Sequence, residues 1–363
     1  DDRGRGGLGR VRVAAMTEGL ATPGAGWRRA DGGSPKKKRK GNGDGRRRSG
    51  RRAAGEVAMV EDAEFTSYYG RPIIKAPVWK TPDVPLYLFL GGAAGSSAVL
   101  GALADLTGRP ALTRTARLVA GGGSLASVVF LIHDLGRPER FLHMLRVFKP
   151  TSPLSVGTYI LSPFSAATGA TAAVELLGWF PRLKRFGGIV AGLFGGPMAT
   201  YTAVLLSNTA VPSWHEFHGK LPFVFAGSAM AAGGGLCMAL TPLAESEPAR
   251  KMAIAGAALE LAVVHQVEGD ESIVAEPYHE GRAGKLMRAA KACTASGLGL
   301  AVLGGRTRWG RVASGTLLAA GSLLTRFGVF EAGMASAKDP KYTVIPQRER
   351  MAARDGAVRS VTR

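Results

Sequence analysis

The sequence predicts an all-α integral membrane protein with eight transmembrane helices. Hydrophobic residues make up 46% of the 363-residue chain, and they gather in long runs between residues 85 and 335. A helix needs about twenty apolar residues to cross ~30 Å of hydrocarbon. Eight runs meet that length, separated by short connections that are often marked by Pro or Gly: 85–106, 115–133, 154–178, 186–207, 221–241, 250–268, 287–305 and 312–335.

Residues 1–58 come first and are predicted to form a disordered basic tail. The runs KKKRK (36–40) and RRRSGRR (46–52) are also typical of nuclear-localisation or nucleic-acid patches. No interleaved aromatics or folded module accompany them, so we expect no nucleic-acid partner. The Arg/Gly-rich composition also fits a mis-assigned extension, translated from GC-rich sequence upstream of the gene. Met59 would then be the first residue of the protein, and the sequence that follows it suits a protein N-terminus. We therefore expect the tail to be dispensable, with residues 59–84 leading into the membrane.

The eight spans of residues 85–335 divide naturally into two four-helix bundles, followed by a polar C-terminal tail at 336–363. The sixth and seventh spans are the weakest, since they are rich in Ala and Gly rather than Leu. Glycines within the spans favour close helix packing in a bilayer. A dinucleotide-binding interpretation of these glycines lacks the required strand–turn–helix context.

The two cysteines, Cys237 and Cys293, are too few for an iron–sulfur cluster or a Cys-rich zinc site. Haem held by two histidines needs His pairs within the spans, and only His133 and His265 come near. We therefore expect no metal, haem or cluster in this chain.

Polar residues gather on one predicted side of the membrane. With eight spans, every odd helix starts and every even helix ends on the side of both termini, which we call the N-side. All six histidines fall there. Ionisable groups at membrane depth are costly and indicate function, although single residues also serve as interfacial anchors. The other polar residues of the N-side include Asp83, Tyr87, Asp134, Tyr201, Trp214, Glu216 and Glu268.

The stretch HDLGRPERF (133–141) closes the second span, and PERFLHMLRVF (138–148) follows it. Apolar residues recur there at helical spacing, with Arg and His between them. This pattern predicts a short amphipathic helix that lies in the interface as a lid.

Three stretches resemble the NrfD / polysulfide-reductase membrane-subunit family. They are DLGRPERFLHMLRVFKPTSPLSVGTYIL (134–161), PDVPLYLFLGGAAGSSAVL (82–100) and YTAVLLSNTAVPSWHEFHGKLPFVFAGSAMAAGG (201–234). The similarity covers about residues 65–340.

This resemblance implies an eight-helix subunit of the cell (cytoplasmic) membrane that exchanges electrons with a quinone, either menaquinone or ubiquinone. It implies two partners: an iron–sulfur, ferredoxin-like subunit and a catalytic, molybdopterin-type subunit of a respiratory complex. The family binds no haem, so electrons would pass directly between a quinol and a cluster on another chain.

The resemblance also implies a quinone site formed by Asp83, Tyr87 and Tyr201. A quinol releases two protons with its two electrons, so a carboxylate or imidazole must accept them. We expect Asp83 to be the base, with His133 or Asp134 as the second choice. Tyr201 would donate a hydrogen bond to a quinone carbonyl.

Two further groups of residues are predicted. Glu175, Glu260 and Arg326 would form either a proton path or a buried ion pair that fixes helix packing. The expected partner interface comprises Arg137, Glu139, Arg140, Trp214, His215, Glu216 and His218. Two rival interpretations remain: a non-redox transporter, which charges near the midplane would favour, and a purely structural membrane anchor.

Overall fold

The computed structural model describes residues 72–137, 139–178, 180–305 and 307–361; the predicted tail at 1–58 and Met59 lie outside them. Over these ranges the chain is helical, and no strand occurs in them, which confirms the all-α prediction. The helices are α1 (Asp83–Leu106), α2 (Pro110–Asp134), α3 (Glu139–Met144), α4 (Pro153–Leu177), α5 (Pro181–Ser207), α6 (Pro212–His215), α7 (Leu221–Leu240), α8 (Glu247–Glu268), the 3-10 helix η1 (Ile273–Tyr278), α9 (Gly281–Leu303), α10 (Arg308–Lys338) and α11 (Lys341–Val361).

Seven of these helices are long and apolar enough to cross a membrane: α1, α2, α4, α5, α7, α9 and α10. The sixth predicted span does form a helix, α8, but it is not among the seven. Charged residues occupy both of its ends, and the stretch between Lys251 and Glu268 is shorter than the roughly twenty residues that a span needs. Of the eight spans predicted, seven thus form helices with the length and composition of a membrane span.

Proline and glycine set several helix ends. Proline stands in the first turn of α2, α4, α5, α6, α7 and α8. The N–H group that proline lacks would have no partner within the helix at this position, and the fixed φ of proline suits the start of a helix. At the end of α4, Gly178 takes the left-handed conformation, with φ of 71°, and its N–H donates to the Val174 carbonyl at 2.9 Å.

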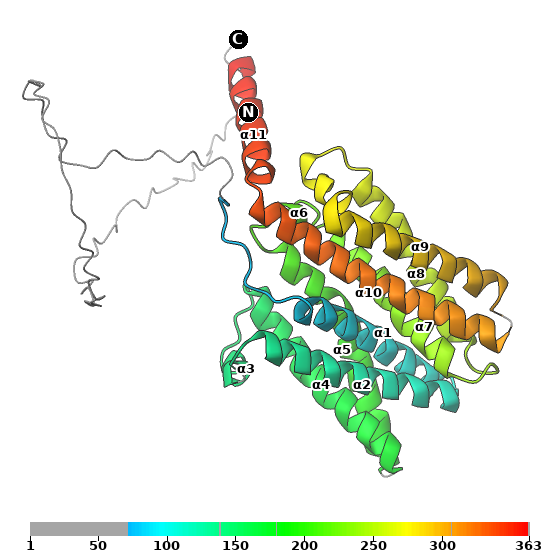
Figure 1. The fold of residues 1–363 in the computed structure, drawn as a ribbon. Coiled ribbons are helices and arrows are strands. Elements are labelled where there is room, and N and C mark those ends of the chain that lie inside the picture. The colour runs from blue at the N-terminus through cyan, green and yellow to red at the C-terminus, as the bar shows by residue number, and fades with distance from the viewer. Residues whose placement is uncertain (1–71, 138, 179, 306, 362–363) are drawn as a thin grey trace, which may run out of the picture. The chain divides into compact units, whose positions relative to one another are not determined.

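The helix contacts fall into two sets of four. In the first set, α1, α2, α4 and α5 pack in a closed circuit; in the second, α7, α8, α9 and α10 do the same. The two sets meet mainly where α1 packs against α7 (Figure 1). Smaller contacts join α5 to α7 and α1 to α10. Polar contacts cross the junction between α1 and α7. The Ser96 hydroxyl of α1 donates to the Ala229 carbonyl of α7 at 2.6 Å, and the Cys237 thiol of α7 donates to the Ser97 hydroxyl of α1 at 3.6 Å.

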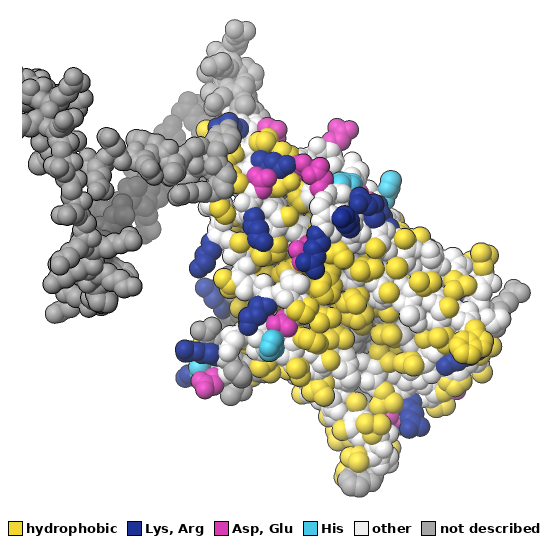
Figure 2. Space-filling model, in the orientation of Figure 1, with side chains coloured by type: hydrophobic (Ala, Val, Ile, Leu, Met, Phe, Trp, Pro, Cys, Tyr) yellow, Lys and Arg dark blue, Asp and Glu magenta, His cyan; other side chains and the backbone are white. Residues whose placement is uncertain are grey.

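Polar elements gather at one end of the helices. Charged side chains cluster in the part of Figure 2 where α3, α6 and α11 lie, and hydrophobic side chains cover most of the remaining visible helix surface. The segment 336–363, predicted as a polar tail, supplies the end of α10 and then α11. The Lys341 ammonium of α11 pairs with the Glu276 carboxylate of η1 at 2.9 Å.

Candidate functional site

A carboxylate–imidazole pair joins the start of α1 to the end of α2. The Asp83 Oδ2 atom lies 2.7 Å from His133 Nδ1. Each residue suits its helix end, since the N-terminus of a helix favours a carboxylate and the C-terminus favours a protonated imidazole. The Asp83 side chain is 7% exposed, whereas that of His133 is 71% exposed. The pair therefore connects a buried carboxylate to an exposed imidazole.

Asp134, the neighbour of His133, has a structural contact. Its Oδ1 atom accepts the backbone N–H of Lys80 at 2.8 Å, and the Lys80 ammonium donates to the His133 carbonyl at 3.3 Å. These bonds hold the segment that leads into α1 against the end of α2. Asp134 thus positions the chain around Asp83.

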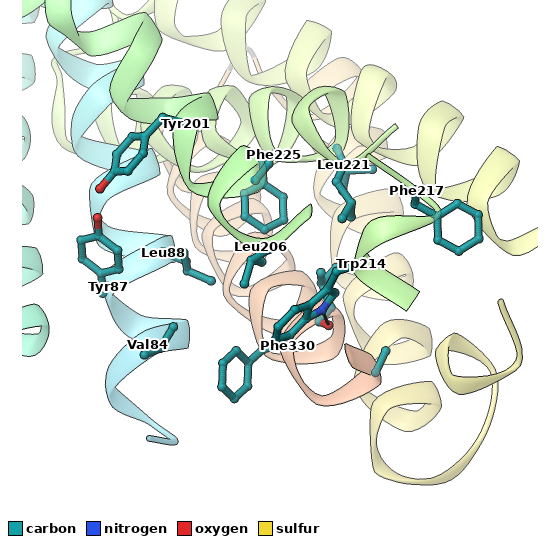
Figure 3. Close-up of a cluster of buried hydrophobic side chains, with 14 of the residues drawn as sticks. Val84, Tyr87, Leu88, Tyr201, Leu206, Trp214, Phe217, Leu221, Phe225 and Phe330 are labelled. Carbon is teal, nitrogen blue, oxygen red and sulfur yellow. Dashed lines mark hydrogen bonds between the residues drawn. The ribbon is translucent and has the colours of Figure 1, made fainter. Parts of the chain in front are cut away.

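Two tyrosines face one another behind this pair. Tyr87 lies one helical turn beyond Asp83 on the same side of α1, and Tyr201 comes from α5. Both rings are buried, and their hydroxyl ends point toward each other (Figure 3). Neither phenol forms a hydrogen bond with another residue of the described ranges. Both donors are therefore available to a ligand.

The Tyr201 ring depends on a glycine of α4. A Cβ added at Gly157 would collide with three ring atoms of Tyr201. The absent side chain leaves room for the Tyr201 ring against α4. The site therefore draws on α1, α2, α4 and α5, the first set of helices.

Trp214, predicted as part of the partner interface, does not reach the surface. Its side chain is fully buried, and its indole N–H donates to the Val329 carbonyl of α10 at 2.8 Å. It stacks on Trp79, with ring centroids 5.7 Å apart, and packs near Phe330 at 5.9 Å. Trp214 supports the surface from beneath and ties the segment before α1 to α10.

The other residues predicted for the interface that the structure describes are exposed. His215, Glu216 and His218 follow one another after α5, and the two imidazole rings lie 5.9 Å apart. Arg137, which precedes α3, and Glu139, the first residue of α3, are exposed as well. The Arg140 side chain lies outside the described residues. The lid helix predicted at 138–148 is shorter, since α3 spans Glu139–Met144.

The loops beside this surface carry fixed charges. Asp270 accepts hydrogen bonds from the Ser272 backbone at 3.1 Å and from the Lys220 ammonium at 3.3 Å. Hydrogen bonding by Ser272, supported by Lys220, lowers the pKa of Asp270. Burial raises the pKa of Tyr278 in η1, and its hydroxyl donates to the Ser213 carbonyl at 3.0 Å.

Glu260 and Arg326 form a buried polar cluster in the second set of helices. Both are at most 1% exposed. The Thr325 hydroxyl donates to Glu260 Oε1 at 2.6 Å, and Arg326 donates to the Phe225 carbonyl at 2.8 Å. The guanidinium also lies 3.6 Å above the Phe225 ring. Glu260 Oε2 and two Arg326 nitrogens have no hydrogen-bond partner among the described residues.

Glu175 belongs to a different cluster, at the opposite end of the first set. Its carboxylate accepts from Arg117 at 3.3 Å and from Lys184 at 2.8 Å. Arg117 also lies 3.3 Å from Asp105. Sequence reasoning missed Arg117, although an arginine just inside the second predicted span was a signal. The structure thus separates Glu175 from Glu260 and Arg326.

Comparison with known proteins identifies the chain's relatives. A family model described as polysulphide reductase, NrfD, matches residues 73–265, more than half of the 363-residue chain. The match includes α1 to α7 and most of α8, and with them Asp83, Tyr87, His133 and Tyr201. A search of curated proteins found no match. The chain therefore belongs to the NrfD family of polysulphide reductase.

Proposed function

We propose that the chain is the membrane-anchoring, quinone-interacting subunit of a multi-subunit oxidoreductase in the cell membrane. The family consists of membrane subunits of redox complexes, and seven apolar helices make this chain a multi-pass membrane protein. We further propose that α8 crosses the membrane as an eighth span, which gives two four-helix bundles. Its apolar face packs against α7 and α9, and this packing shields it from lipid.

One observation carries the proposal: the Asp83–His133 pair lies beside two tyrosine hydroxyls that form no hydrogen bond with any other residue the structure describes. Quinol oxidation to a quinone releases two electrons and two protons. Asp83 accepts the two protons one after the other from the quinol hydroxyls, and His133 passes each of them to water at the exposed end of α2 before the next is taken up. Tyr87 and Tyr201 donate hydrogen bonds to the quinone oxygens and so orient the ring. In the reverse direction the same residues deliver protons.

The electrons require a partner, because we place no redox centre in this chain. We propose that an iron–sulfur subunit docks on the polar end, over the exposed residues Arg137, Glu139, His215, Glu216 and His218, and that it connects to a molybdopterin-type catalytic subunit. The Asp83–His133 pair opens at that same end. A quinone bound there, either menaquinone or ubiquinone, would lie beneath the docked cluster.

Quinone binding also requires a change in the position of a tyrosine ring. Both rings belong to the large hydrophobic core cluster that extends through both helix sets. A quinone ring would enter between their hydroxyls only when one phenol turns aside, as protein interiors leave few voids of that size. We therefore expect quinone affinity to depend on how freely the Tyr201 ring moves over Gly157.

Quinol oxidation by the assembled complex tests the proposal. Replacing Tyr201 with Phe removes one hydroxyl and keeps the ring, so we expect turnover to fall about tenfold, the value of one net hydrogen bond. Tyr159→Phe is the matched control, since the Tyr159 hydroxyl donates to the Leu145 carbonyl near α3. Equal rates in the two variants would remove Tyr201 from the quinone site.

Gly157→Ala tests ring position without changing a polar group. The new methyl group collides with the Tyr201 ring, so the ring must move from its present position. We expect KM for quinol to rise several-fold. Gly169→Ala on the same helix is the control, because a Cβ there meets nothing within 4 Å. A KM unchanged by both substitutions would show that the quinone binds elsewhere.

The buried Glu260–Arg326 cluster favours a second function, ion movement through the chain. A transporter without redox activity would move ions in the absence of quinol. A purely structural anchor would assemble with its partners and show no turnover. Turnover and ion flux, measured on the assembled complex in vesicles, separate the three functions.

A further inference from the structure

A largely apolar slot of about 700 Å³ opens between the two sets of helices. Its walls come from α1, α5, α7 and α8, and its hydrophobic side chains include Val99, Leu103, Met230 and Met252. The slot is as large as cavities that hold small molecules. It begins where Gly95 of α1 and Gly195 of α5 approach so closely that a Cβ on either would collide with the other's carbonyl oxygen.

The slot is about as deep as one leaflet of a bilayer. Along α1 its lining runs from Ser96 to Thr107, a rise of about 16 Å. This is roughly half of a ~30 Å hydrocarbon core. Leu103, one of the lining residues, is 56% exposed, so the slot is open toward lipid. A ligand can therefore enter sideways from the bilayer.

Two cationic side chains line the same end of the slot. They are Arg109, at the start of α2, and Lys251, in the second turn of α8. The Glu245 carboxylate accepts the N–H groups of Ala111 and Leu112 at 2.8 and 3.1 Å, which ties the turn before α8 to α2. Within the described part of the chain, no carboxylate oxygen lies within 4.0 Å of the charged nitrogens of Arg109 or Lys251.

Arg109 also lines a second, polar cavity of about 440 Å³ beside the slot. Arg114, Arg117 and Lys184 line it too, together with Asp105 and Glu175. Cations outnumber carboxylates in this lining. Polar, positively charged space thus adjoins the cationic end of an apolar slot.

We propose that the slot binds one anionic phospholipid. An acyl chain fills the apolar part between α1, α5, α7 and α8, and the phosphate lies between Arg109 and Lys251. Basic pockets between transmembrane helices recognise anionic headgroups in this way. The bound lipid fills the space between the two helix sets at the end away from Asp83. The proposal is independent of the quinone site.

The positive charges of Arg109 and Lys251 favour an anionic phospholipid over a quinone tail or a zwitterionic lipid. The isoprenoid tail of a quinone is apolar, so it gains nothing from Arg109 or Lys251. A zwitterionic lipid carries a compensating ammonium, so its attraction to the two cations is weaker. An anionic headgroup satisfies both side chains at once.

Lipid retention by the purified full-length chain tests the proposal. The chain is reconstituted in nanodiscs with equal amounts of phosphatidylglycerol and phosphatidylcholine, and the lipids that remain bound are counted by native mass spectrometry. We expect enrichment of phosphatidylglycerol. Arg109→Gln and Lys251→Gln should each lower this enrichment about fivefold, given the contribution of one basic residue near a headgroup. Arg182→Gln, an exposed cation at the same end, should leave it unchanged.

A second pair of variants tests the acyl-chain site. Gly196 lines the slot, and a Cβ there meets nothing within 4 Å, so Gly196→Phe fills the slot without a clash at Cβ. It should release the bound phosphatidylglycerol, whereas Gly169→Phe on the outer face of α4 should not. Equal retention of the two lipids, unchanged enrichment in Arg109→Gln and Lys251→Gln, or release of quinone rather than phospholipid by Gly196→Phe would each overturn the proposal.

Discussion

Asp83→Asn is expected to slow quinol oxidation by the assembled complex about a hundredfold or more. Asparagine keeps the size of the side chain and a carbonyl oxygen that faces His133, but it cannot accept a proton at neutral pH. Removal of a positioned general base typically costs a factor of 10² to 10⁴. The measurement is the rate of menaquinol or ubiquinol oxidation, normalised to the amount of assembled complex in the membrane.

Two controls keep this result interpretable. Asp339→Asn replaces an exposed carboxylate after α10 and should leave the rate unchanged. His133→Gln removes the exposed end of the relay but leaves Asp83 close to solvent, so a smaller loss is expected. Normal turnover in Asp83→Asn, with normal assembly, would exclude Asp83 as the proton acceptor.

Arg326→Met is expected to cause the largest loss of stability. The guanidinium is completely buried, donates to the Phe225 carbonyl and lies over the Phe225 ring. Its removal leaves the Glu260 carboxylate buried with the Thr325 hydroxyl as its main donor. Leaving a buried charge uncompensated costs about 3–5 kcal/mol. The free energy of unfolding, measured by denaturant titration in mixed micelles, should fall by about that amount.

The double variant Arg326→Met/Glu260→Gln separates the charge from the packing. If an uncompensated carboxylate causes the loss, neutralising Glu260 should restore about 1–3 kcal/mol, a range typical of coupled neighbours. A double variant no more stable than Arg326→Met would attribute the loss to packing on Phe225. Ion flux abolished in Glu260→Gln at unchanged stability would instead support the proton path.

Much of the fold could be predicted from the sequence because bilayer thickness sets span length. Of the eight apolar runs that met this length, seven form helices long and apolar enough to cross a membrane. The sixth run illustrates the limit. Its charged ends make α8 marginal as a span, and its apolar face is covered by α7 and α9, which no single-sequence pattern specifies.

The candidate site was predictable only in part. Counting helix ends placed Asp83, His133 and Tyr201 on one side, and the structure brings Asp83 and His133 into contact. The same counting could not show that Trp214 turns inward or that Glu175 pairs with Arg117, since both depend on which helix faces lie together. Nor could it show that Gly157 makes room for the Tyr201 ring.

The central claim is that this chain holds a quinone ring between Tyr87 and Tyr201. Photolabelling tests it most directly, because it needs no partner subunit. A photoreactive azidoquinone is bound to the purified full-length chain in nanodiscs, and the adducts are mapped by peptide mass spectrometry with and without excess menaquinone. We predict adducts on α1 around Tyr87 and on α5 around Tyr201 that menaquinone competes away and that Gly157→Ala weakens. Competed adducts on other helices, or none at all, would contradict the account.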